Sequence, residues 1–266
     1  MNDKYFKEIK TPFRTCELVK SSGYKMDNLH WHTYYEILFI TKGERYTVFN
    51  SGNAHEGGCP QIYIHRPYAP HKSIVPRDSE YEFYVVYIYR NTLRSVGDIV
   101  DLSIFERACM LSILPTDAEA CWLRTKCAEL IEADRAGEHT ESALLAALIL
   151  NRTLKFSNCE VFTTRSEYMQ DVLQYIEENL SGELTIEKLC QSFSVGHTKL
   201  LSDFKKATGT TFKKFLTDLR MSRARELLAS GSSIINASLE TGYSSEAHFI
   251  KAFREYYGIT PGGMKG

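Results

Sequence analysis

The feature that most constrains this 266-residue chain is a pattern that occurs twice in its last hundred residues. The segments Thr185–Gly209 and Ser233–Gly258 each predict a short helix, a tight turn and a second helix. In both copies a core aromatic residue lies five positions before a glycine, which suits the left-handed end of a helix. Such a unit is a helix-turn-helix, whose second helix can enter the major groove of DNA.

Helical periodicity separates an inward face from an outward face on the two predicted reading helices, near residues 197–206 and 245–255. Leu200 and Phe204 are expected to face the core in the first copy, and Phe249 and Phe253 in the second. The remaining face supplies the predicted DNA-binding residues, which are Thr198, Lys199, Leu201, Ser202, Lys205 and Lys206 in the first copy and Ser245, Glu246, Ala247, His248, Lys251 and Arg254 in the second.

Charge is unevenly distributed although the formal net charge is only −1. Eight basic and two acidic residues lie between Lys199 and Arg225, whereas the preceding predicted helix is acidic. A basic stripe of this kind is typical of a surface that faces phosphates. Solvated helix faces would explain any one of these helices, but they do not explain a duplicated unit with matched aromatics and glycines.

The segment 211–231 between the two copies predicts a single amphipathic helix. About 20 residues at 1.5 Å per residue give a spacer of roughly 30 Å. One turn of the DNA duplex is about 34 Å, so a rigid spacer of this length would present both reading helices to successive major grooves on one face.

The C-terminal hundred residues closely resemble the AraC/XylS family of transcription regulators. The most specific run is His248-Phe249 followed by Ala252-Phe253 and Gly258-Ile259-Thr260-Pro261. Further matches are Ile186, Leu189-Cys190, Leu200, Phe204-Lys205-Lys206, Gly209, Phe212, Leu219-Arg220, Ala224, Leu227-Leu228, Ile234 and Gly242-Tyr243.

That resemblance implies a sequence-specific regulator with double-stranded DNA as its partner and RNA polymerase as a further candidate partner. It implies neither an enzyme nor catalytic residues. The first copy departs from the family pattern, because Ser194 replaces the usual turn glycine and Gly196 the usual capping serine. Asp203 stands at a usually apolar position, and Leu201 at a normally polar position that faces DNA.

The segment from Tyr24 to Arg90 predicts β structure, because short aromatic and β-branched runs alternate with glycine and proline turns. Several strands at this spacing favour a sandwich or a barrel. The run from His30 to Gly43 and the later Pro70-His71 resemble the cupin barrel. We therefore predict a cupin-like sensor domain over residues 1–96.

Four residues of the cupin-like motif would share one face of a strand: His30, His32, Tyr34 and Glu36. Together with His71, they are predicted to bind a small-molecule effector. Imidazole and carboxylate ligands would also suit a transition metal. No essential metal and no cofactor are expected, because regulators of this family commonly keep such residues as pocket groups.

Two alternatives for the N-terminal region stay open. One is a metal-dependent cupin enzyme with a DNA-binding appendage. The other keeps DNA binding but makes the barrel an assembly module without a ligand.

From Gly97 the pattern becomes helical, with a capping box at Thr116 and a second helix start near Thr140. We predict a helical linker or dimerisation region over 97–160, an irregular linker over 156–165 and the DNA-binding domain over 165–266. A homodimer is expected through the apolar faces that bear Leu123, Leu130, Leu144 and Leu148, although packing within one chain is an equal alternative.

The remaining composition indicates a cytoplasmic protein with the α+β fold class. Its seven cysteines include no C-x-x-C pair, which argues against a disulfide scaffold and a zinc finger. The first residues carry charges where a signal peptide would be apolar. The longest apolar run, 143–150, is far shorter than the ~20 residues of a membrane span, so no membrane partner is expected.

Overall fold

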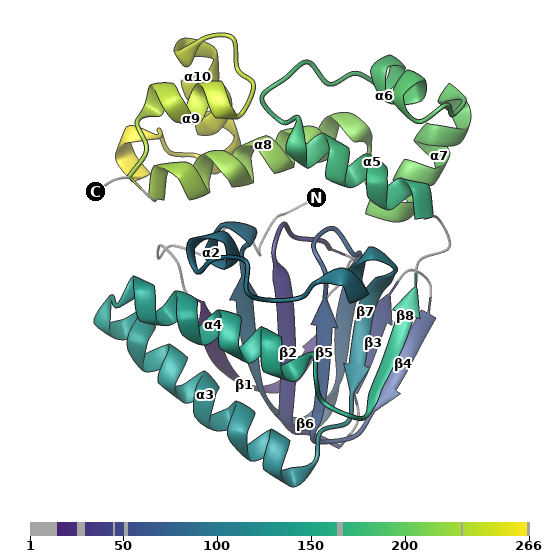
Figure 1. Cartoon of the computed structure of the whole chain (residues 1–266), viewed down its shortest axis with the longest axis vertical. Helices are drawn as coiled ribbons and strands as arrows, with labels where there is room; N and C mark the ends of the chain where they lie inside the picture. Colours follow the sequence, from purple (N-terminus) through teal and green to yellow (C-terminus); the bar gives the residue numbers. More distant parts are fainter. Residues whose placement is uncertain are drawn as a thin grey trace. The chain divides into compact units, whose positions relative to one another are not determined.

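The structure, a computed structural model, divides into two compact units, one of which is Arg14–Glu167 while the other contains Tyr168–Gly266 (Figure 1). It describes residues 15–25, 30–44, 46–50, 53–163, 167–229 and 231–264. The first unit contains β1 (Cys16–Lys25), β2 (Tyr35–Lys42), β3 (Tyr46–Asn50), β4 (Asn53–Gly57), β5 (Gln61–His65), β6 (His71–Ile88), α2 (Arg90–Ser95), η1 (Ser103–Glu106), β7 (Ala108–Ile113), α3 (Asp117–Ala136), α4 (His139–Thr153) and β8 (Cys159–Thr163).

The strands form one antiparallel sheet in the order β4-β3-β6-β2-β5-β7-β8, with β1 paired to β6. Strand β6 is long enough to pair with β3 through its first residues and with β2 through its last. The predicted α+β class is confirmed, but the predicted closed barrel is not. The edge strands β4 and β8 meet through the rings of His55 and Phe162, whose centroids are 3.9 Å apart, and no backbone ladder joins these two strands among the described residues.

The sheet is buried on both faces, which explains why its strands are apolar at successive positions. Tyr35, Ile37 and Phe39 of β2 pack in the core that also contains α3 and α4, whereas Leu38 and Ile40 pack in a second core on the opposite face. This second core contains Tyr46 and Tyr63, each 1% exposed, with their rings edge to face.

Helices α3 and α4 pack side by side across one face of the sheet (Figure 1). The predicted capping box is confirmed, since the Thr116 hydroxyl accepts from the Glu119 amide and the Glu119 carboxylate accepts from the Thr116 amide. Only half of the face expected to form a homodimer interface is available at the surface. Leu123 and Leu130 are fully buried in the chain's own core, whereas Leu144 and Leu148 are 51% and 41% exposed.

The region 97–160 is not a separate helical segment. It contains η1 and β7 as well as α3 and α4, and β7 pairs with β5 inside the sheet. The segment 156–165, predicted to be an irregular linker, contains β8, which pairs with β7. These strands extend the sheet beyond residue 96. The sequence analysis missed them, because alternation over six or five residues is too short to stand out from a helical context.

The C-terminal unit is helical in every described element. Phe204 and Phe215 lie at the centre of its first half, while Phe249 and Phe253 pack on the second half of the long central helix. The two predicted helix-turn-helix units and the single helix between them are confirmed. The elements are α5 (Glu167–Glu178), α6 (Ile186–Ser192), α7 (His197–Thr208), α8 (Phe212–Ala229), α9 (Ile234–Glu240), α10 (Glu246–Tyr257) and η2 (Gly262–Met264).

The turns of the two units share one backbone geometry. The amide of Val195 donates to the carbonyl of Cys190 at 3.1 Å, and the amide of Tyr243 donates to Ser238 at 3.0 Å. The preceding residue is left-handed in both, with φ 50° at Ser194 and 74° at Gly242. A serine therefore occupies a position that favours glycine.

Replacing Ser194 with glycine is expected to raise the free energy of unfolding of the C-terminal unit by about 1 kcal/mol, because a side chain in this conformation costs about 1–2 kcal/mol. Far-UV circular dichroism during urea unfolding would measure the change. Ser192→Gly, at the end of α6, is the control and should lower stability, since glycine weakens a helical position. Equal effects of the two changes would show that φ at Ser194 carries no strain.

No helix in the described part of the chain combines the length and apolarity needed to cross a membrane.

Candidate DNA interface and histidine–glutamate cluster

The outward face of α7 carries the predicted DNA-binding residues of the first unit. Leu200 and Phe204 are buried at 0% and 1% exposure, so the inward face is as predicted. Leu201 is 38% exposed, an apolar side chain on the reading helix. All six predicted residues of this helix are exposed, namely Thr198, Lys199, Leu201, Ser202, Lys205 and Lys206.

The cations of α7 are not equivalent. The Lys199 ammonium pairs with the Asp203 carboxylate, which also accepts from the Tyr168 hydroxyl at 2.7 Å. This pairing links α7 to α5 and raises the pKa of Lys199, chiefly through its bond to Asp203. Lys205 and Lys206 lie in the last turn of α7 with no ion-pair partner in the described part of the chain. Their ammonium groups are therefore more exposed to an incoming anion than that of Lys199.

The second reading helix, α10, begins at a side-chain cap. The hydroxyl of Ser245 accepts from the amide of His248 at 3.2 Å, which satisfies one free donor of the first turn. The Lys251 side chain is 72% exposed, and its ammonium lies 4.0 Å from the exposed Glu255 carboxylate, so this pairing is weak. Every predicted residue of this helix is exposed: Ser245, Glu246, Ala247, His248, Lys251 and Arg254.

Arg220 of α8 connects the two helix-turn-helix units. Its guanidinium donates to the carbonyls of Leu180 and Gly182, which precede α6, and lies over the ring of Tyr243, which follows α9. Neither charge counting nor periodicity distinguishes this arginine from its basic neighbours. Only the tertiary contacts show that it touches both units.

Three histidines and a glutamate of the first unit come together at one end of the sheet. His30 and His32 precede β2 in a loop, Glu36 lies in β2 and His71 begins β6. The predicted continuous strand through His30 and His32 is wrong, because β2 starts at Tyr35. The loop nevertheless brings one ligand atom from each of these four residues within 4.8 Å of one another.

The orientations of two imidazoles are fixed by backbone carbonyls. His32 Nδ1 lies 2.8 Å from the carbonyl oxygen of Tyr34, and His71 Nδ1 lies 2.8 Å from that of Ala69. A carbonyl has no proton to give, so each Nδ1 carries one, and Nε2 of a neutral ring is a lone pair. These Nε2 atoms lie 3.6 and 3.3 Å from the Glu36 carboxylate and have no hydrogen-bond partner in the described residues.

Burial dominates the electrostatics of the cluster. It lowers the pKa of His32 well below the usual value, and the neighbouring His71 adds to that shift. The pKa of His30 is lowered for the same two reasons. Burial opposes the charged form of Glu36, but the proximity of His71 and His30 outweighs it and holds the pKa of Glu36 below its usual value.

Two aromatic rings enclose the cluster. Tyr34, predicted as an effector residue, stacks on His32 with the ring centroids 4.0 Å apart. His65, which the sequence analysis did not select, stacks on His71 at 3.8 Å and is fully buried, with neither ring nitrogen hydrogen-bonded in the described structure. His65 ends the apolar strand β5, where the sequence pattern indicates a core position. The sequence therefore offered no signal that this histidine lies beside the cluster.

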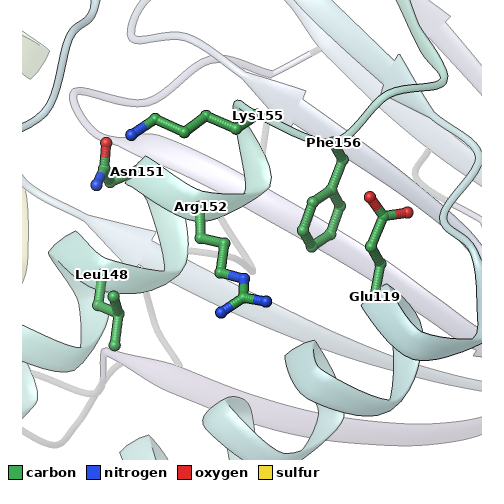
Figure 2. A pocket seen from close by; sticks show the side chains of 6 residues that line it. All are labelled: Glu119, Leu148, Asn151, Arg152, Lys155 and Phe156. Atoms are coloured by element: carbon green, nitrogen blue, oxygen red, sulfur yellow. The ribbon is translucent and has the colours of Figure 1, made fainter.

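An open groove of about 450 Å³ lies elsewhere in this unit, between the start of α3 and the end of α4 (Figure 2). The guanidinium of Arg152 lies over the Trp122 ring, 4.6 Å from its centroid. None of the predicted effector residues lines this groove. Its lining is Glu119, Leu148, Asn151, Arg152, Lys155 and Phe156.

Comparisons with known proteins concern mainly the C-terminal unit. Residues 189–265 match the helix-turn-helix domain family. The transcriptional regulator ArgR of Pseudomonas aeruginosa is 34% identical over 87 residues, which are 32% of this chain and 26% of ArgR. The transcriptional regulator GadX of Escherichia coli is 30% identical over 129 residues, 44% of this chain and 47% of GadX.

The matched segments span less than half the length of either regulator. Among solved structures, ToxT from Vibrio cholerae O395 aligns with 93% of this chain and 95% of its own, at a TM-score of 0.49 and 14% identity. The family match begins within α6 and extends beyond α10, so it includes the run from His248 to Pro261. In residues 189–265 the chain therefore has a helix-turn-helix domain, similar to those of AraC/XylS-type transcription regulators.

Proposed function

We propose that the whole protein is an effector-responsive transcription regulator that reads two successive major grooves of double-stranded DNA. The observation that carries this proposal is the pair of reading helices, α7 and α10, whose predicted DNA-binding residues are all exposed. Helix α8 joins the units with 18 residues, or roughly 27 Å at 1.5 Å per residue. This length is close to the ~34 Å between successive major grooves on one face of DNA.

Selection from a random duplex library with the full chain tests the proposal. We expect enrichment of one motif with two conserved blocks about 10 base pairs apart, because each helix reads its own groove. A chain that enriches no motif over scrambled duplex at physiological salt would contradict it.

The N-terminal unit is the proposed effector-binding part, with His30, His32, Tyr34, Glu36 and His71 as its binding residues. These side chains combine buried polar atoms with a stacked aromatic ring, which is the chemistry of a specific small-molecule site. A thermal-shift screen with sugars and metabolites, repeated on Tyr34→Ala, would identify compounds that stabilise the wild type alone. A hit that stabilises both proteins equally binds elsewhere.

We also propose that the protein forms a homodimer through the exposed face of α4. Leu144 and Leu148 lie one helical turn apart, and each would lose apolar surface to a second copy. The double change Leu144→Asp and Leu148→Asp is expected to weaken dimerisation at least about tenfold, seen as monomers by light scattering at micromolar concentration. Leu114→Asp, at an equally exposed leucine before α3, is the control. A wild-type monomer, with and without DNA, would refute the dimer.

A further inference from the structure

The first reading helix carries a carboxylate where the second has a small apolar side chain. Phe204 and Phe253 each lie five positions before their glycine, and this alignment of the two copies places Asp203 opposite Ala252. Ala252 packs at the edge of its core, whereas the Asp203 side chain is 19% exposed. A negative charge on a reading helix opposes the approach of DNA phosphates unless its neighbours neutralise it.

The lysine one helical turn before Asp203 neutralises this charge. The Lys199 ammonium pairs with the Asp203 carboxylate, at the i, i+4 spacing that places two side chains on one face of a helix. The hydroxyl of Tyr168 in α5 donates to the same carboxylate at 2.7 Å, and the Lys199 ammonium lies 4.9 Å from the centre of the Tyr168 ring. Two favourable contacts therefore direct the lysine toward α5.

We propose that Asp203 competes with DNA phosphate for Lys199, so that one cation of the first reading helix is unavailable to DNA of any sequence. The inference rests on the proposed role of α7 in reading DNA. The carboxylate offers the ammonium the same charge-assisted contact with oxygen that a phosphate would offer. The Lys199 side chain is 63% exposed, so a phosphate can reach it, but binding then exchanges one anion for another and adds little affinity.

Both members of the pair keep their charges at neutral pH. The bond to Lys199, followed by the bond to Tyr168, lowers the pKa of Asp203 below its usual value. The bond to Asp203 raises the pKa of Lys199. Protonation of the carboxylate therefore does not free the lysine in the neutral range, and only a competing anion or a substitution does so.

The competition acts on one lysine and not on the whole helix. Lys205 and Lys206 lie in the last turn of α7 and form no ion pair in the described part of the chain. Lys206 lies three residues after Asp203, and its charge is the weakest of the contributions that lower the pKa of that carboxyl group. Lys199 is thus the cation that loss of the carboxylate should release.

Asp203→Asn separates charge from packing. The amide has the size of the carboxylate, and its oxygen can still accept from the Tyr168 hydroxyl, but the negative charge is lost. We expect the affinity for a selected and for a scrambled duplex to rise alike, by roughly fivefold at physiological salt, because one further phosphate contact steepens the dependence of log affinity on log salt by about 0.9. Anisotropy titrations of labelled duplexes with the full chain, over a salt series, measure both quantities.

The same change in a Lys199→Ala background tests the mechanism. Without the lysine no cation is released, so Asp203→Asn should then raise the affinity much less and leave the salt slope unchanged. Tyr168→Phe breaks the hydrogen bond between α5 and α7 but keeps the carboxylate charge, so it should not raise the affinity. Glu129→Gln removes a carboxylate that is paired with a lysine in α3, and it controls for the change in net charge.

An unchanged affinity in Asp203→Asn, with a wild type that binds both duplexes, would overturn the inference and leave the proposed function standing. An equal rise in the Lys199→Ala background would overturn it too, since this indicates plain repulsion by Asp203. So would a rise confined to the selected duplex, which indicates a base contact at residue 203. A wild type that enriches no motif would count against the proposed function, and titrations on the scrambled duplex would still decide the inference.

Discussion

Replacing Gly242 with alanine is expected to destabilise the C-terminal unit by about 2–5 kcal/mol and to abolish specific DNA binding. A Cβ atom here would lie 2.7 Å from the Leu180 carbonyl oxygen and 2.6 Å from a nitrogen of Arg220. The left-handed conformation (φ 74°) adds about 1–2 kcal/mol for any side chain, and overpacking about 1–3 kcal/mol. The clash also displaces the arginine that connects the two units.

Gly209→Ala is the matched control for this change. Gly209 has nearly the same φ, 72°, but a Cβ atom there meets nothing within 4 Å. It should therefore cost only the conformational part, about 1–2 kcal/mol. Urea unfolding followed by far-UV circular dichroism measures the helices of both units, so the tryptophan signal is needed to separate them. The fluorescence of Trp31 and Trp122 reports on the first unit and should not change. Equal costs at the two glycines would show that Arg220 and Leu180 move aside freely.

Lys251→Ala and Lys205→Ala are expected to affect DNA binding in different ways. Lys251 lies in the first half of α10, the part of a reading helix that reaches base edges, and can approach guanine O6 or N7. Its loss should relax specificity at one or two base pairs by about 1–3 kcal/mol. Lys205 lies in the last turn of α7, where phosphates are nearer, so its loss should weaken binding to all sequences alike.

Binding titrations over a salt series, on a selected duplex and on a scrambled one, separate the two effects. The Lys205→Ala variant should lower the salt slope by about one ion, because one phosphate contact disappears. Lys199→Ala is an informative comparison: its charge is already paired with Asp203, so we expect a smaller change in slope. A preserved ratio of specific to scrambled affinity in Lys251→Ala would place that side chain away from the bases.

Local patterns were sufficient to predict the C-terminal unit. The spacing of Phe204 and Phe253 from their glycines depends on contacts within a few residues, as do the caps at Thr185, Ser233 and Ser245 that the structure adds. The outward faces of α7 and α10 follow from the same short-range periodicity. The family resemblance marked Ser194 as a departure from the usual turn glycine, and the structure shows that its position is left-handed, with φ 50°.

The first unit was less predictable because its organisation depends on pairings between distant strands. Strand β7 joins the sheet next to β5, and β8 next to β7, across the 45 residues that hold α3 and α4. Neither short strand has a strong pattern of its own, and a sheet that does not close into a barrel cannot be distinguished from one that does by alternation alone. Packing between distant segments also decided the position of Leu123 and Leu130, which are buried in the core. Their helical spacing alone suits a core and an interface equally.

The sequence by itself therefore determined the helix-turn-helix domain, the outward faces of α7 and α10 and the residue types of the histidine–glutamate cluster. The tertiary structure decided which groups act together: that Arg220 bridges the two units, that Lys199 is neutralised by Asp203, and that His65 stacks behind His71. It also decided that the imidazole lone pairs of the cluster converge on Glu36. Periodicity gives the direction of a side chain from its own helix or strand, whereas its partner depends on how distant segments pack together.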